Sequence, residues 1–116
     1  MSPSQHSAKN RRAFPRAETS ADGRLFEVQD HGGMAAPIAC EVTDLSRGGM
    51  GVVSRRMLHI GSTVIVVLPS AEGDPRILAG QVRNIAYAGN GLHRVGVQFC
   101  AMPEVSDRSV LFRRAA

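Results

Sequence analysis

A six-stranded antiparallel β-barrel followed by a short C-terminal α-helix is the fold that this sequence of 116 residues predicts. Six short apolar runs, rich in valine and isoleucine, are separated by turn signals made of Gly, Pro, Asn and Asp, a pattern typical of small all-β domains. An open six-stranded sheet would leave exposed edges, and closing the sheet into a barrel removes them. The length suffices for one domain with its own core but not for two.

The predicted strands comprise residues 21–28, 37–45, 50–54, 63–68, 76–87 and 93–100. The first strand alternates polar and apolar side chains, and a glycine-containing turn signal follows it. In the second strand, Ile38, Cys40 and Val42 are spaced two apart and are expected to face the core. The third follows a glycine-rich turn, and Leu58 and Ile60 are expected to hold the connector after it against the core.

The remaining elements follow from β-branched content, turn signals and the order of charges. The fourth strand is apolar and β-branched without a break, which favours a strand. The fifth is long, and its apolar spacing indicates a bulge or bend; a hairpin at residues 88–91 leads into the sixth. After Pro103, residues 104–114 begin with acidic and end with basic side chains. Because this order suits a helix dipole, an α-helix is predicted there.

Composition narrows the classes of partner. The formal net charge is +4 and the sequence pI is about 10.0, which favours anionic partners. Only 4% of the residues are aromatic and none is Trp, too few for a platform that stacks nucleic-acid bases, so no nucleic acid is expected as a partner. Cys40 and Cys100 are expected to be free and buried, and the scattered histidines do not form a zinc site. No cofactor is therefore predicted.

Several further classes are excluded by missing patterns. The sequence has no run of the ~20 apolar residues that a transmembrane helix needs, and its N-terminus lacks the apolar core of a signal peptide. It also lacks paired carboxylates, a Ser–His–Asp context and a metal cluster. We therefore predict a cytoplasmic protein with no membrane insertion and no enzymatic activity. For the oligomeric state, which none of these patterns determines, the expectation is a monomer or a weak homodimer.

The turn between the second and third predicted strands carries the first functional motif. Asp44 and Ser46 offer carboxylate acceptors and a hydroxyl, and Gly48 and Gly49 allow a ligand to approach the backbone closely because they have no Cβ. These residues form a D-x-S-x-x-G pattern (Asp44, Ser46, Gly49). A second interpretation stays open, in which Asp44 and Ser46 only cap the turn.

A cluster of arginines before the first strand carries the second motif. Arg12 and Arg16 form an R-x-x-x-R pair, Arg11 directly precedes them, and Asp44 lies 28 positions after Arg16. The two motifs in this order, before a strand-rich body that ends in R-V-G-V-x-F, resemble the PilZ domain family. The resemblance covers roughly residues 11 to 112. PilZ domains are bacterial receptors for the second messenger cyclic di-GMP.

The resemblance implies a layout and a ligand. Residues 1–10 would be a flexible tail and residues 11–116 the domain, with a ligand-binding arm at 11–17, the barrel at 21–100 and the helix at 104–114. The arm would fold over the ligand and so change a surface to which an unknown effector protein binds. Arg11 suggests that two stacked ligand molecules bind. The implied site residues for cyclic di-GMP are Arg11, Arg12, Arg16, Asp44, Ser46, Gly48 and Gly49.

Chemistry supports these roles. Guanidiniums donate paired hydrogen bonds to phosphate or to guanine O6 and N7, and a carboxylate at Asp44 would accept from the guanine N1–H and N2 amino groups. Gly96 is expected to pack in the core and not to contact the ligand. The alternatives are a PilZ-type adaptor that binds only proteins, and an arginine cluster that is merely a basic tail.

Overall fold

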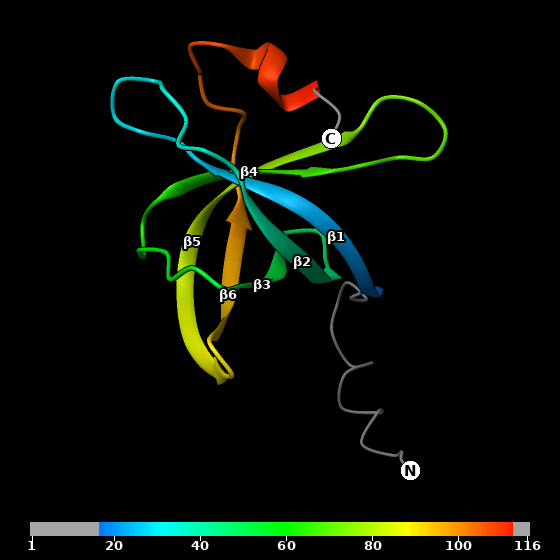
Figure 1. Cartoon of the computed structure of the whole chain (residues 1–116), viewed down its shortest axis with the longest axis vertical. Coiled ribbons are helices and arrows are strands. Elements are labelled where there is room, and N and C mark those ends of the chain that lie inside the picture. The colour runs from blue at the N-terminus through cyan, green and yellow to red at the C-terminus, as the bar shows by residue number, and fades with distance from the viewer. Residues whose placement is uncertain (1–16, 113–116) are drawn as a thin grey trace.

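The computed structural model describes residues 17–112, with side chains from Ser20 onward. Its six strands form one closed antiparallel barrel in the order β1-β2-β3-β6-β5-β4, and the pairing of β1 with β4 closes it (Figure 1). This arrangement confirms the predicted barrel. The strands are β1 (Ala17–Glu27), β2 (Ile38–Leu45), β3 (Gly49–Ser54), β4 (Thr63–Leu68), β5 (Arg76–Gly89) and β6 (Leu92–Phe99).

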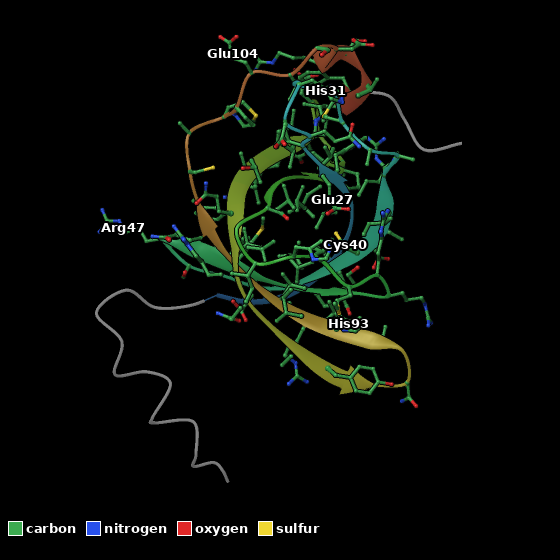
Figure 2. The ribbon with its side chains drawn as sticks, turned by 90° about the vertical axis from the view of Figure 1, so that its left-hand side faces the viewer. Glu27, His31, Cys40, Arg47, His93 and Glu104 are labelled. Atoms are coloured by element: carbon green, nitrogen blue, oxygen red, sulfur yellow. The ribbon has the colours of Figure 1, made fainter. Side chains whose placement is uncertain are left out.

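The barrel interior is a close-packed apolar core. Cys40 and Val42 are buried there as predicted, Ile38 packs against the same cluster, and Figure 2 shows Cys40 inside the ring of strands. Leu58, in the loop between β3 and β4, is fully buried in this core. Ile60 was expected beside it but is 67% exposed, because the loop turns outward after its one buried anchor.

A second apolar cluster lies on the outer face of the barrel. Phe26, Ile65 and Val67 point outward from β1 and β4, and Leu111 of the C-terminal segment packs onto them. Strand β4 is thus buried on both faces, which explains why residues 63–68 are apolar without alternation. At about 25 cal/mol per Å² of apolar surface removed from water, such cover stabilises the docked segment substantially.

The C-terminal α-helix predicted over 104–114 is wrong. The described part of that segment, up to residue 112, contains only the five-residue 3₁₀ helix η1 (Arg108–Phe112). The Ser106 amide donates to the Gly32 carbonyl at 2.9 Å, which ties the chain to the loop between β1 and β2 (Figure 1). Asp107 caps η1 by accepting from the Ser109 amide at 3.0 Å. Tertiary contacts therefore determine the conformation where charge order favoured a helix.

Two smaller expectations also differ from the structure. Strand β1 begins at Ala17, four residues before its predicted start, because its first residues pair with the end of β2 beyond a bulge. Cys100 is a free but exposed thiol that directly follows the last residue of β6, and its amide still donates to the Ala79 carbonyl of β5 at 3.0 Å. The predicted irregularity of β5 is confirmed by register shifts between Val82 and Asn84 and near Tyr87.

Candidate functional site

The turn between β2 and β3 is built by its own hydrogen bonds. The Ser46 amide and the Ser46 hydroxyl both donate to the Gly49 carbonyl, at 2.9 and 3.2 Å. The Phe99 amide donates to the Gly48 carbonyl at 2.8 Å and fixes the turn to the end of β6. Ser46 therefore caps the turn. Its hydroxyl oxygen keeps lone pairs that can accept a hydrogen bond from a ligand.

Gly49 is required by the packing of the turn against β6. A Cβ built at this position would overlap the Val97 carbonyl oxygen, a backbone atom that belongs to the ladder between β3 and β6. At Gly48, in contrast, a Cβ would meet no heavy atom within 4 Å. The two neighbouring glycines thus differ in role, because one is a close-packing position and the other borders open space.

A cross-strand row runs from the motif across the barrel wall. Asp44 on β2 pairs with Gly51 on β3, Gly51 with Gly96 on β6, and Gly96 with Asn84 on β5. A Cβ built at Gly51 would lie 2.8 Å from Asp44 Oδ2, and one at Gly96 would lie 2.5 Å from Asn84 Oδ1. The polar side chains therefore lean over the glycines from both ends. Gly96 faces this row on the outer wall, which corrects the expectation that it packs in the core.

The row forms the floor of a groove of about 530 Å³ on the outer face of the barrel. Arg83 and Arg94 supply positive charge to its walls, and Arg83 Nε donates to Gln98 Oε1 at 2.7 Å. Figure 2 shows Arg47, from the adjacent turn, projecting outward from the wall. The lining residues of the motif and its neighbours are Thr43, Asp44, Ser46, Gly48, Gly49, Met50 and Gly51. A groove with one carboxylate, two side-chain amides and two guanidiniums can recognise the donor and acceptor edges of an anionic ligand.

The structure brings together four of the seven predicted site residues, namely Asp44, Ser46, Gly48 and Gly49, along one groove. The predicted site residues Arg11, Arg12 and Arg16 lie outside the described residues. The chain enters the described part at Ala17, whose backbone pairs with Leu45 directly beside the motif.

Sequence reasoning missed the far wall of the groove. Arg94 and Gly96 are two apart in β6, so alternation alone would have placed both on one face. The position of Asn84 on this wall could not be predicted, because the bulge after Val82 breaks the alternation of inward and outward side chains in β5.

A second, smaller groove of about 320 Å³ lies between β1, the loop after it and the C-terminal segment. There the Arg24 guanidinium lies 5.6 Å from the centroid of the Phe26 ring and donates to the Leu111 carbonyl at 3.4 Å. Arg24 thus helps to hold the C-terminal segment in place.

Within residues 17–112, no three His, Cys, Asp or Glu side chains are grouped so that they could hold a metal ion. No helix in this range is long and apolar enough to cross a membrane.

Comparison with known proteins now defines the family. The model of the PilZ domain family matches residues 10–114. The chain therefore belongs to the PilZ domain family, a family of receptor domains for cyclic di-GMP that act as receptors or adaptors and not as enzymes.

A solved structure also shares the fold. It is that of the inhibitor of motility MotI/DgrA from Bacillus subtilis, with a TM-score of 0.55 and 18% sequence identity. The match covers 80% of this chain and 44% of that protein, so this chain spans less than half the length of MotI/DgrA. Comparison with curated proteins gives no match.

Proposed function

We propose that this protein binds cyclic di-GMP in the groove beside the D-x-S-x-x-G turn and passes the signal to an effector protein. The single observation that carries the proposal is the cross-strand row, in which Asp44 leans over bare glycine backbone inside a groove lined by guanidiniums. A purine can lie against backbone that has no Cβ. The Asp44 carboxylate accepts from guanine N1–H and N2, donors that adenine does not present together.

The arm would complete the site. Arg16 immediately precedes Ala17, and Ala17 pairs with Leu45. Because consecutive Cα atoms are about 3.8 Å apart, the first described residue of β1 would tie the C-terminal end of the arm to the edge of the groove. Arg12 and Arg16 would then donate to the phosphates or to guanine O6 and N7, and Arg11 would add a contact to a second stacked ligand.

Signal transmission would follow from closure of the arm over the ligand. An arm that takes a new position on the barrel presents a different surface to an effector, and the ligand shifts the population toward that state by its differential affinity. By the same proposal, the protein acts in the cytoplasm as a monomer or a weak homodimer and has no catalytic role.

Isothermal titration calorimetry of the full chain with cyclic di-GMP tests this proposal, with cyclic di-AMP and GTP as competing ligands. We expect guanine-selective binding. Arg16→Ala should weaken it about a hundredfold, because two charge-assisted hydrogen bonds of roughly 1.5 kcal/mol each are lost. Asp44→Asn should weaken it at least about tenfold, because an amide replaces one acceptor with a donor.

The matched control is Arg55→Ala, an exposed arginine in the loop between β3 and β4 that does not line the groove. It removes the same charge as Arg16→Ala and should leave the Kd unchanged. The stoichiometry of the titration reports whether Arg11 accompanies a second ligand. A folded protein that binds no cyclic di-GMP would overturn the proposal in favour of an adaptor that recognises only proteins.

A further inference from the structure

The groove continues beyond the predicted motif onto β5 and β6. Two cross-strand glycines, Gly51 and Gly96, contribute no side chains of their own to its centre, and the Asp44 and Asn84 side chains lean over them. Asp44 bounds this glycine floor on β2 and Asn84 bounds it on β5. With neighbouring strands about 4.8 Å apart, the backbones of β2 and β5 are separated by about 14 Å along the wall. When the Asp44 and Asn84 side chains turn to bind the edges of a base, the two glycine strands between them leave a surface on which that flat base can lie.

Arg83 and Arg94 flank the glycine floor along the strand direction. Arg94 lies two residues before Gly96 on the outer face of β6, and Arg83 lies in the bulge beside Asn84. The four polar groups therefore surround the floor, with one carboxylate and one amide across the strands and one guanidinium on either side.

The guanidinium groups of Arg83 and Arg94 differ in whether they already have a hydrogen-bond partner in the described structure. Arg83 is held by Gln98, as its Nε donates to Gln98 Oε1 at 2.7 Å. The cross-strand neighbours of Arg94 are Val53 and Ala86, neither of which can accept from a guanidinium through its side chain. Within residues 17–112, the side chain of Arg94 makes no hydrogen bond or ion pair and is exposed. All of its donors are thus available to a ligand at the edge of the floor.

We propose that Arg94 is a ligand-binding residue that contacts a phosphate of the bound nucleotide while a base lies on the glycine floor. This inference rests on the proposed function and adds to the two motifs a contact that neither contains. Asp44 is the only carboxylate that lines the described groove and suits the donor edge of the base. The phosphate, as the anionic part of the ligand, then pairs with the guanidinium that has no other partner in the described chain.

The experiment titrates cyclic di-GMP into the full chain and into the variants Arg94→Ala, Arg94→Lys and Arg55→Ala. Loss of a charge-assisted contact should weaken binding about tenfold or more in Arg94→Ala. Arg94→Lys should recover most of the affinity, because an ammonium binds phosphate as a point charge. Arg55→Ala removes the same charge outside the groove and should bind like the wild type.

A further variant tests the floor itself. Gly96→Ala places a methyl group that overlaps the Asn84 side chain as far as its Cγ, whereas none of its three nearest atoms belongs to the backbone. The Asn84 side chain must therefore turn aside, and the barrel should fold with a thermal midpoint close to that of the wild type. The methyl group would raise the base from the floor and weaken binding about tenfold. Unchanged affinity in Gly96→Ala would overturn the placement of the base.

The outcomes separate this inference from the proposed function. If the wild type binds and Asp44→Asn loses affinity while Arg94→Ala binds like the wild type, the role of Arg94 is overturned and the receptor function stands. Equal losses in Arg94→Ala and Arg55→Ala would show a general charge effect and overturn the contact. Loss in Arg94→Ala without recovery in Arg94→Lys would overturn the phosphate assignment. A wild type that binds no cyclic di-GMP overturns both proposals.

Discussion

The two neighbouring glycines of the turn give the sharpest test of how the motif is built. In Gly49→Ala, the new Cβ would overlap the Val97 carbonyl oxygen, which is backbone and cannot rotate away. The turn must then move from β6, and the hydrogen bond from the Phe99 amide to the Gly48 carbonyl is lost or lengthened. In Gly48→Ala, no heavy atom lies within 4 Å of the new Cβ and φ is not positive.

The magnitudes follow from these contacts. Overpacking against a rigid neighbour costs about 1–3 kcal/mol, and the displaced backbone hydrogen bond adds about 1 kcal/mol. Gly49→Ala should therefore lower the free energy of unfolding by about 3 kcal/mol. At about 4 °C per kcal/mol for a domain of this size, the thermal midpoint should fall by roughly 10 °C. Gly48→Ala should stay within about 0.5 kcal/mol of the wild type.

Thermal and urea unfolding of both variants in the absence of ligand measures the difference directly. Because no ligand is present, the result reports packing and not binding. If Gly49→Ala melts at the same temperature as Gly48→Ala, the close approach of the turn to β6 does not explain the glycine. Titration of Gly48→Ala with cyclic di-GMP then asks the separate question of whether a ligand occupies the open space above Gly48.

Two more predictions concern the core and the turn. Burial, aided by the nearby charge of Asp22, raises the pKa of the Cys40 thiol from 9.0 to about 11. The unfolded chain therefore loses this proton first, and stability should fall by on the order of 2 kcal/mol as the pH rises from 9 to 11. Urea unfolding should show a smaller decrease across that pH window in Cys40→Ala, and equal decreases would contradict the thiol's role. Ser46→Ala removes the hydroxyl that donates to the Gly49 carbonyl, so it should lower stability by about 0.5–1 kcal/mol and also weaken cyclic di-GMP binding; a change in unfolding with an unchanged Kd in titration would show that Ser46 only caps the turn.

Periodicity predicted the barrel because most of its strands have one buried and one exposed face. Cys40 and Val42 follow the two-residue period that such a strand imposes, and the structure buries both. Strand β4 was found by a different signal, an unbroken β-branched run. The sequence could not reveal the reason for that run, the burial of its second face under Leu111, because the covering segment is distant along the chain.

The elements that were mispredicted depend on such distant contacts. The charge order of residues 104–114 is a local signal, whereas the bond from Ser106 to Gly32 joins segments that are far apart in the sequence. Ile60 is as apolar as Leu58, and only the path of the loop decides which of the two is buried. Local propensity is a weak prior that tertiary contacts override.

The candidate site likewise has one part that could be predicted from the sequence and one part that could not. Its motif half was predictable because Asp44 and Ser46 are close in sequence and belong to a pattern that resembles a known family. The half that contains Asn84 and Arg94 was not, since it depends on cross-strand register and on a bulge that shifts Asn84 into line with Gly96. Register is set by pairing between strands and cannot be read from one strand alone.

Register also explains how two motifs 28 positions apart would serve one groove, as the proposed function requires. Arg16 and Asp44 are far apart in sequence, but the antiparallel pairing of β1 and β2 sets Ala17 opposite Leu45 and Glu18 opposite Asp44. Residues in the loop between the two strands can be added or removed without changing this pairing, because a longer loop costs little free energy. A residue added within β1 would instead shift the pairing and turn its side chains to the other face. The bulge in the first half of β1 therefore determines where the arm leaves the barrel relative to the groove.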